Sequence, residues 1–222
     1  MNKKHIWITI GVILLVLILD QTLKIWVKTH MLIGESSYTN WNWDIKWFQI
    51  LFVENKGMAF GWQLPGDNGK LILTIFRIII IGLIVFYLIK LMKKQAPLGL
   101  LITFGLIIAG AAGNIIDSMF YGLIFSQSQD IITLSQNVEP AKFVAFGQGY
   151  ASFLHGNVVD MLYFPLFSFK WPNFLPFIGG SYFTFFEPIF NIADSSITIG
   201  VIILLVFSKR WFKHIDVSKS LS

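Results

Sequence analysis

The chain contains no cysteine and few charged residues. The absence of cysteine excludes disulfide bonds, thiol catalysis and thiolate metal sites. Only 13% of the 222 residues are charged and 55% are hydrophobic, which leaves too little charge to cover a soluble domain of this size. A nucleic-acid-binding motif is also missing, so the net charge of +5 does not indicate a nucleic-acid partner. The composition therefore indicates an integral membrane protein.

Four apolar stretches approach the length of a membrane-spanning helix, which needs about 20 mostly apolar residues. They lie at about residues 5–23, 71–91, 98–116 and 190–207. Lysines precede the first, as in a signal peptide, but residues 20–24 are wrong for a cleavage site, so we expect an uncleaved helix. The sequence predicts one membrane-embedded domain over residues 1–222, with long connections at about 27–70 and 118–189.

Basic residues flank the spans in a pattern that predicts their orientation. They stand before the first span, between the second and third, and after the fourth, at Lys3, Lys4, Lys90, Lys93, Lys94, Lys209, Arg210, Lys213 and Lys219. If all four helices cross the membrane, these flanks share one side, and their positive charge makes that side cytoplasmic. Both termini are then cytoplasmic, and both long connections lie outside.

The two outer connections carry different signals. Partial alternation of apolar and polar residues over 41–53 predicts short strands. In the second connection, residues 125–156 are mixed and polar, whereas residues 161–188 are rich in aromatic rings and interrupted by four prolines. The prolines argue against a fifth span. We expect the ring-rich segment to lie at the membrane surface.

Four aspartates carry the candidate chemistry. Inserting a charged side chain at the centre of a span costs about 2.5–3.5 kcal/mol on insertion scales, so a charged residue in a span usually has a function. Asp20, Asp117 and Asp194 fall at the predicted outer ends of their spans, with Asp117 closing the third. Asp160 precedes the ring-rich segment. Two close carboxylates share one proton near neutral pH, so one can draw a proton from water while the other donates to a peptide carbonyl. Spacing alone does not choose the pair.

Structural roles for these residues are the first alternative. The acids could only end helices or bond to one another, and Asp20 is spaced to pair with Lys24, four residues later. The small residues 109–113 predict close packing of the third helix, which would bring Asp117 into the bundle. Arg77 is more typical of a buried partner for an acid, or of a headgroup contact, than of a catalyst.

Other functions fit the sequence less well. The chain has no HExxH motif for a zinc peptidase, and neither His30 nor His155 lies on a predicted span, where a Ser–His pair would need it. A transporter or proton-linked channel could use the acids as a relay, but a relay spreads its acids through the depth of the bilayer. Here the acids gather at one level, which favours an aspartic peptidase with a site open to the outer face.

Five blocks of the sequence resemble lipoprotein signal peptidase, the signal peptidase II family of bacteria. They follow the family's order at residues 20–24, 54–61, 110–117, 158–160 and 190–195. The resemblance implies an endopeptidase that cleaves diacylglyceryl-modified prolipoproteins before the lipidated Cys, with Asp160 and Asp194 as the catalytic pair. It also implies a set of residues that shape or support the site, namely Asp20, Lys24, Asn55, Gly57, Asn114, Asp117, Asn191 and Ala193.

The resemblance also implies the setting of this chemistry. It implies no metal and no cofactor, membrane lipids and lipid-modified prolipoproteins as partners, globomycin-type cyclic peptides as inhibitors, and a place in the bacterial inner membrane. An extracytoplasmic strand cradle with a loop over the site suits residues 30–68. The expected fold is thus membrane all-α, with four transmembrane helices, a small extracytoplasmic β-cradle and a ring-rich interfacial insertion.

The chain departs from the family pattern in two places. Ser118 stands where the family usually has Arg, so another group such as Lys142 must take over its role, or the role is lost. In addition, 42 residues lie between Asp117 and Asp160, and the extra outer segment 125–156 could be a partner surface, a lid or a lineage decoration. An inactive homologue that binds lipidated peptide is a further alternative, which the presence of both candidate catalytic aspartates disfavours.

Overall fold

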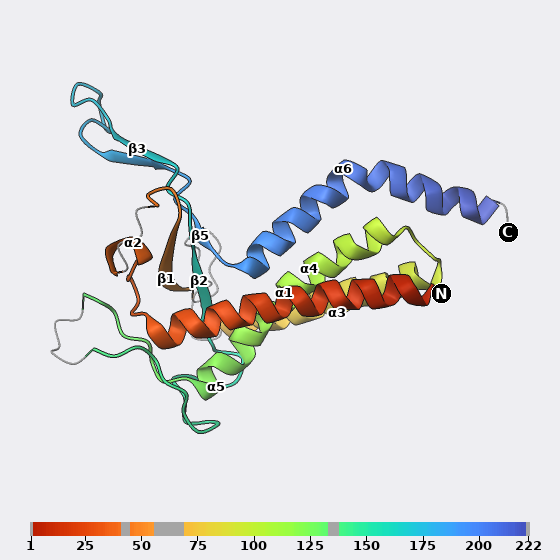
Figure 1. The fold of residues 1–222 in the computed structure, drawn as a ribbon, viewed down its shortest axis with the longest axis horizontal. Coiled ribbons are helices and arrows are strands. Elements are labelled where there is room, and N and C mark those ends of the chain that lie inside the picture. The colour runs from red at the N-terminus through yellow and green to blue at the C-terminus, as the bar shows by residue number, and fades with distance from the viewer. Residues whose placement is uncertain (1, 41–44, 56–68, 133–137, 221–222) are drawn as a thin grey trace.

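The described part of the chain is built around four long apolar helices. The computed structural model describes residues 2–40, 45–55, 69–132 and 138–220 (Figure 1). The helices that are long and apolar enough to cross a membrane are α1 (Lys3–His30), α3 (Gly69–Lys93), α4 (Leu98–Ile116) with its continuation, and α6 (Ile192–Ser220). These helices match the four predicted spans. A helix suits lipid because all its backbone polar groups are satisfied within the segment.

Helix α4 is the centre of the bundle. Of its apolar stretch, 56% is buried inside the protein, against 11–17% for the other three spans. Glycines let its neighbours approach closely: a Cβ on Gly110 would overlap the backbone carbonyl of Ala193, and one on Gly113 would come 2.6 Å from Oδ2 of Asp20. The predicted close packing of the small residues in this helix is therefore confirmed.

The chain remains helical beyond the end of α4. The π-helical turn η1 (Asp117–Tyr121) and the short α5 (Gly122–Ile124) continue the rod. Asp117 thus ends the regular helix α4, as predicted, but the helical span continues beyond it to Ile124. The insertion that follows supports this end, since the backbone N–H of Gly156 donates to the carbonyl of Ser118 at 2.8 Å. Within the extended rod, the side chain of Asp117 is fully buried.

A three-stranded antiparallel sheet lies at one end of the bundle, hereafter the sheet end. Its order is β1 (Gln49–Asn55), β2 (Val158–Tyr163) and β5 (Ile189–Phe190). The strands predicted within residues 41–53 are confirmed in part, because β1 begins at Gln49 and residues 41–44 lie outside the described residues. Between α1 and β1 lies the one-turn helix α2 (Ser37–Asn40).

Helix α1 continues past its predicted end at residue 23 because its last turns pack under the sheet. There Val27 joins Phe52 of β1 and Val159 of β2 in one buried core. Each of the three side chains is completely buried. This core holds the middle strand of the sheet against the first helix. It therefore sets the position of the β2 residues along the bundle.

The second long connection forms two separate parts. Residues 125–132 and 138–156 run along the sheet end, where the backbone N–H of Ile131 donates to the carbonyl of Ile33 at 3.0 Å. Strands β3 (Phe167–Lys170) and β4 (Tyr182–Phe185) form an antiparallel hairpin of their own, which runs obliquely away from the sheet end (Figure 1). Residues 161–188, all of them described, contain no helix, as predicted.

Candidate active site

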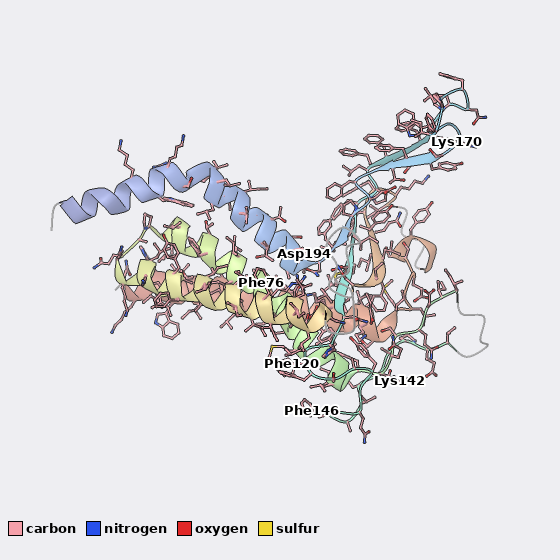
Figure 2. The ribbon with its side chains drawn as sticks, turned by 180° about the vertical axis from the view of Figure 1, so that it is seen from behind. Phe76, Phe120, Lys142, Phe146, Lys170 and Asp194 are labelled. Carbon is pink, nitrogen blue, oxygen red and sulfur yellow. The ribbon has the colours of Figure 1, made fainter. Side chains whose placement is uncertain are left out.

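Polar side chains from distant parts of the chain meet where the sheet joins the bundle. The middle strand β2 holds Asp160, and the first turn of α6 holds Asp194, which Figure 2 shows at the start of that helix. Helix α1 contributes Asp20 and Lys24, and α4 contributes Asn114. Asp160 is only 5% exposed, so its carboxyl group is removed from bulk water.

Asn191 links the two aspartates that the family resemblance marks as catalytic. Its Nδ2 donates to Oδ1 of Asp160 at 2.7 Å. Its Oδ1 accepts the backbone N–H of Asp194 at 2.8 Å, and its own backbone N–H donates to Oδ2 of Asp194 at 3.4 Å. These two reciprocal bonds form a capping box, which explains why an Asn and an Asp three residues apart begin α6. One side chain therefore starts the helix and also orients both carboxyl groups.

Asn114 connects this pair to a buried ionic cluster. Its Nδ2 donates to Oδ1 of Asp194 at 2.8 Å, and its Oδ1 accepts a hydrogen bond from Nζ of Lys24 at 2.8 Å. The same Nζ lies 2.9 Å from Oδ2 of Asp20 and 2.8 Å from Oδ2 of Asp117. The predicted pairing of Asp20 with Lys24 is confirmed, and Asp117 shares the same lysine.

The two carboxylates of the ionic cluster also hold the elements that carry the catalytic candidates. Oδ1 of Asp20 accepts the backbone N–H of Ala193 in the first turn of α6 at 2.9 Å. Oδ2 of Asp117 accepts the backbone N–H of Val159, next to Asp160, at 3.4 Å. Each acid satisfies a buried backbone donor that would otherwise lack a partner. Their contacts are those of supporting residues.

The carboxyl group of Asp160 titrates far above its ordinary range. Burial, followed by the negative charge of Asp194, raises the pKa of Asp160 to about 7. Hydrogen bonds from Asn55 and Asn191 and the charge of Lys24 oppose the rise without cancelling it. At neutral pH, Asp160 therefore exchanges a proton readily, as a general acid must.

A cavity of about 230 Å³ opens beside Asp194. Its walls come from α3, α4 and α6, at Phe76, Arg77, Ile80, Ile81, Ala111, Asn114, Asp194 and Ile197. Figure 2 labels Phe76 and Asp194. An apolar wall with a few convergent polar groups is typical of a substrate site. Asp194 thus faces a space that could admit a mainly apolar ligand with a few polar groups.

Arg77 is the residue of this cavity that sequence reasoning did not place in the site. The structure brings its charge near Asp194 and Asp160, both of which interact with it electrostatically. A role as a buried partner for an acid stays a prediction, because the interaction is electrostatic only and Arg77 is partly buried. An Arg in an otherwise apolar span was the available signal, because such a charge needs a polar environment.

Other predicted positions lie elsewhere. Lys142 is exposed at the surface, where it pairs with Glu139, so the idea that it replaces the family Arg is wrong. Ser118 donates to the backbone carbonyl of Asn114 at 3.0 Å and contributes no charge. Gly57 lies outside the described residues.

A second buried ion pair escaped the sequence analysis. Lys28, one turn beyond Lys24, pairs with Glu54 of β1, and Ser128 of the insertion hydrogen-bonds to both. Nδ2 of Asn157 also donates to Glu54 at 2.6 Å. Burial opposes ionisation of Glu54, but the charge of Lys28 and these hydrogen bonds outweigh it and lower the pKa of Glu54. The pair ties the insertion to the strands beside Asp160.

Comparison with known proteins places all five sequence blocks within one match. A family model described as signal peptidase (SPase) II matches residues 12–210. The lipoprotein signal peptidase of Porphyromonas gingivalis (strain ATCC 33277) is 48% identical over 201 residues, 90% of this chain and 82% of the relative. That of Amoebophilus asiaticus (strain 5a2) is 36% identical over 208 residues, 93% and 79% of the two chains.

Solved structures agree with this comparison. A bacterial membrane enzyme determined by the in meso method at 2.3 Å resolution is 26% identical, with a TM-score of 0.56 over 92% of this chain and 89% of that one. A second, at 1.9 Å resolution, is 28% identical, with a TM-score of 0.54 over 90% and 92%. The likeness therefore extends over the helices and the sheet together.

Proposed function

Because the chain belongs to the signal peptidase II family, we propose that it removes signal peptides from diacylglyceryl-modified prolipoproteins by cutting before the lipidated Cys. The protein is a membrane peptidase with several spans. Its likeness to lipoprotein signal peptidases supports a prolipoprotein as the substrate. The apolar cavity beside Asp194 suits a substrate whose reactive bond stands next to lipid.

The proposed mechanism uses Asp160 and Asp194 on one water molecule. The Asp194 carboxylate accepts hydrogen bonds from Asn114 and Asn191, which stabilise its negative charge, and it takes a proton from the water. The water oxygen forms a bond to the carbonyl carbon of the peptide, while Asp160 donates its proton to the carbonyl oxygen. Asp194 then passes the proton it took from water to the leaving nitrogen, and the C–N bond breaks. Asp160 takes a proton back from a hydroxyl group of the tetrahedral intermediate, which leaves a carboxylic acid and an amine, and the pair again holds one proton.

The contact of Asn191 with both aspartates is the observation that carries this proposal. A side chain that bonds Asp160 at 2.7 Å and caps the turn holding Asp194 sets their separation. The pKa of about 7 at Asp160 supports its role as the proton donor. Asp20, Lys24, Asn55, Asn114, Asp117, Asn191 and Ala193 then serve as supporting residues.

The proposed setting is the bacterial inner membrane. The basic flanks favour cytoplasmic termini, which would put the sheet end, and with it the site, at the outer face. Membrane lipids and globomycin-type cyclic peptides are the further partners that the family resemblance implies.

Cleavage of a diacylglyceryl-modified prolipoprotein by the purified protein in lipid nanodiscs tests the function. Wild type should release the signal peptide, with chelator or without, and Asp160→Asn and Asp194→Asn should not, although both remain folded. Glu139→Gln, which changes an exposed surface acid, is the matched control and should cleave normally. Activity in either Asn variant would refute the pair, and an inactive wild type would favour a non-enzymatic binding protein or a transporter.

A further inference from the structure

The β3–β4 hairpin has one face made of aromatic rings. In its register, Phe167 pairs with Phe185 and Phe169 with Phe183. The rings touch in sequence: Phe167 stacks on Phe185 at a centroid distance of 5.0 Å, and Phe169 contacts Phe183 at 5.3 Å. Trp171 extends the row, 4.8 Å from Phe169. The alternation of a strand places all five side chains on the same side.

The opposite face of the hairpin is polar. Ser168 pairs with Thr184, and their hydroxyl groups share a hydrogen bond of 3.0 Å. Lys170 pairs with Tyr182, and its Nζ lies 5.7 Å from the centre of that ring. The hairpin is therefore amphipathic, with an aromatic face and a polar face that carries a positive charge.

Within the described part of the chain, nothing covers the aromatic face. Phe167 is 54% exposed and Phe185 45% exposed, and at the turn between the strands Phe177 is entirely exposed. Figures 1 and 2 show the hairpin standing clear of the helices, with Lys170 near its far end. A two-stranded hairpin with an uncovered apolar face is marginal in water, so this face requires a partner.

The chemistry of the face selects lipid as that partner. Protein interfaces carry about one hydrogen bond per 100–200 Å². The aromatic face offers only phenylalanine rings and one indole N–H, whereas the polar groups and Lys170 lie on the other face. An apolar face rich in Phe and Trp, opposite a face with a basic residue, is the pattern of segments that lie in the membrane interface.

The position of the hairpin supports the same partner. It begins four residues after β2 and ends just before β5, which leads directly into the membrane-spanning α6. Its base therefore starts at the level where α6 enters the bilayer. In Figure 1 the hairpin leaves the sheet end obliquely, with its base beside the start of α6 and its tip away from the helices.

We propose that the aromatic face of the β3–β4 hairpin binds the boundary between headgroups and acyl chains beside the active site. The hairpin is the connection between β2, which carries Asp160, and α6, which carries Asp194. Its attachment to lipid fixes the depth of both carboxyl groups relative to the membrane. The depth of the carboxyl groups matters for a substrate held by its own diacylglyceryl group, so that consequence rests on the proposed function. The contact of the hairpin with lipid does not rest on it.

Because the chain has no cysteine, single-cysteine labelling tests the contact directly. Phe167→Cys and Ser168→Cys are neighbours on opposite faces, and Phe177→Cys samples the exposed turn, where little packing can be lost. Each variant of the full chain is labelled with an environment-sensitive fluorophore in nanodiscs without substrate. Labels at 167 and 177 should be quenched by brominated lipids, and the label at 168 by aqueous iodide.

Three results would overturn the proposal. Iodide quenching of the labels at 167 and 177 would mean that the face lies in water. Protection of both labels from iodide and from brominated lipids would mean that a protein surface, such as a second copy of the chain, covers the face. Equal quenching at 167 and 168 by lipid would mean that the hairpin does not lie with one face toward the membrane. None of these measurements requires cleavage, so their failure is separate from failure of the proposed peptidase activity.

Discussion

The side-chain amide of Asn191, just before α6, donates to the carboxyl group of Asp160 in β2 at 2.7 Å. The same side chain begins α6 by capping the turn that holds Asp194. A helix cap that also bonds a reactive acid couples the start of the last span to the middle strand of the sheet. The separation of the two aspartates therefore depends on one amide.

Asn191→Ala is predicted to lower kcat by about 100-fold, since small displacements of catalytic groups have effects of that size. Because Asn191 acts through the aspartates in the proposed mechanism, KM should change little. Asn191→Asp retains a cap, but it places a third carboxyl group beside the pair and should also lower kcat. Steady-state cleavage of a lipidated prolipoprotein in nanodiscs separates kcat from KM. A variant with normal kcat would show that Asn191 serves only to begin α6.

The pH dependence of cleavage should follow the proton on Asp160. Its pKa is raised to about 7, so the group keeps its proton below that pH and loses it above, where it can no longer donate to the substrate. The value of kcat/KM should therefore fall by about tenfold per pH unit on the alkaline side. Because the charge of Asp194 acts on Asp160, the observed midpoint depends on both acids.

Asn55→Ala should move the alkaline limb of the pH profile, where kcat/KM falls, to higher pH. The hydrogen bond from Asn55 lowers the pKa of Asp160, so its removal makes the proton harder to lose. The pH profile of kcat/KM for the variant and wild type under the same conditions is the measurement. A limb that moves to lower pH, or does not move, would remove Asn55 from the control of this proton.

Lys24→Met should destabilise the folded protein strongly. Its Nζ is the shared ion-pair partner of Asp20 and Asp117 inside the bundle, and removing one partner of a buried ion pair typically costs about 3–5 kcal/mol. The combined variant Lys24→Met, Asp20→Asn, Asp117→Asn removes the uncompensated charges and should recover part of the loss. Thermal unfolding in detergent measures the stability of both variants.

Lys90→Met, at an exposed position of α3, is the control and should change stability by less than about 0.5 kcal/mol. If Lys24→Met unfolds like the control, the cluster does not stabilise the fold.

The spans, their small-residue packing and the level of the acids were predictable because they depend on residues close in sequence. Hydropathy depends on the side chains of a helix and not on its backbone hydrogen bonds. The π-helical turn after Ile116 could therefore not be predicted from hydropathy. The contact of Lys28 with Glu54 and Ser128 depends on how the insertion folds back, which no local spacing encodes. The alternation of Phe167, Ser168, Phe169 and Lys170 could have indicated the amphipathic hairpin, but no strand was predicted there.

Glycine at position 110 should be required for activity as well as packing. A Cβ at this position would overlap the backbone carbonyl of Ala193, which cannot move aside without shifting the first turn of α6 and with it Asp194. Gly110→Ala should therefore cost about 1–3 kcal/mol of stability through overpacking and lower the cleavage rate as well. Gly82→Ala is the matched control, because a Cβ there meets nothing within 4 Å and alanine favours a helix. Thermal unfolding and cleavage rates of both variants decide the matter. Equal behaviour of the two would mean that α4 and α6 can separate at this contact without disturbing Asp194, and that the aspartate is held by its hydrogen bonds alone.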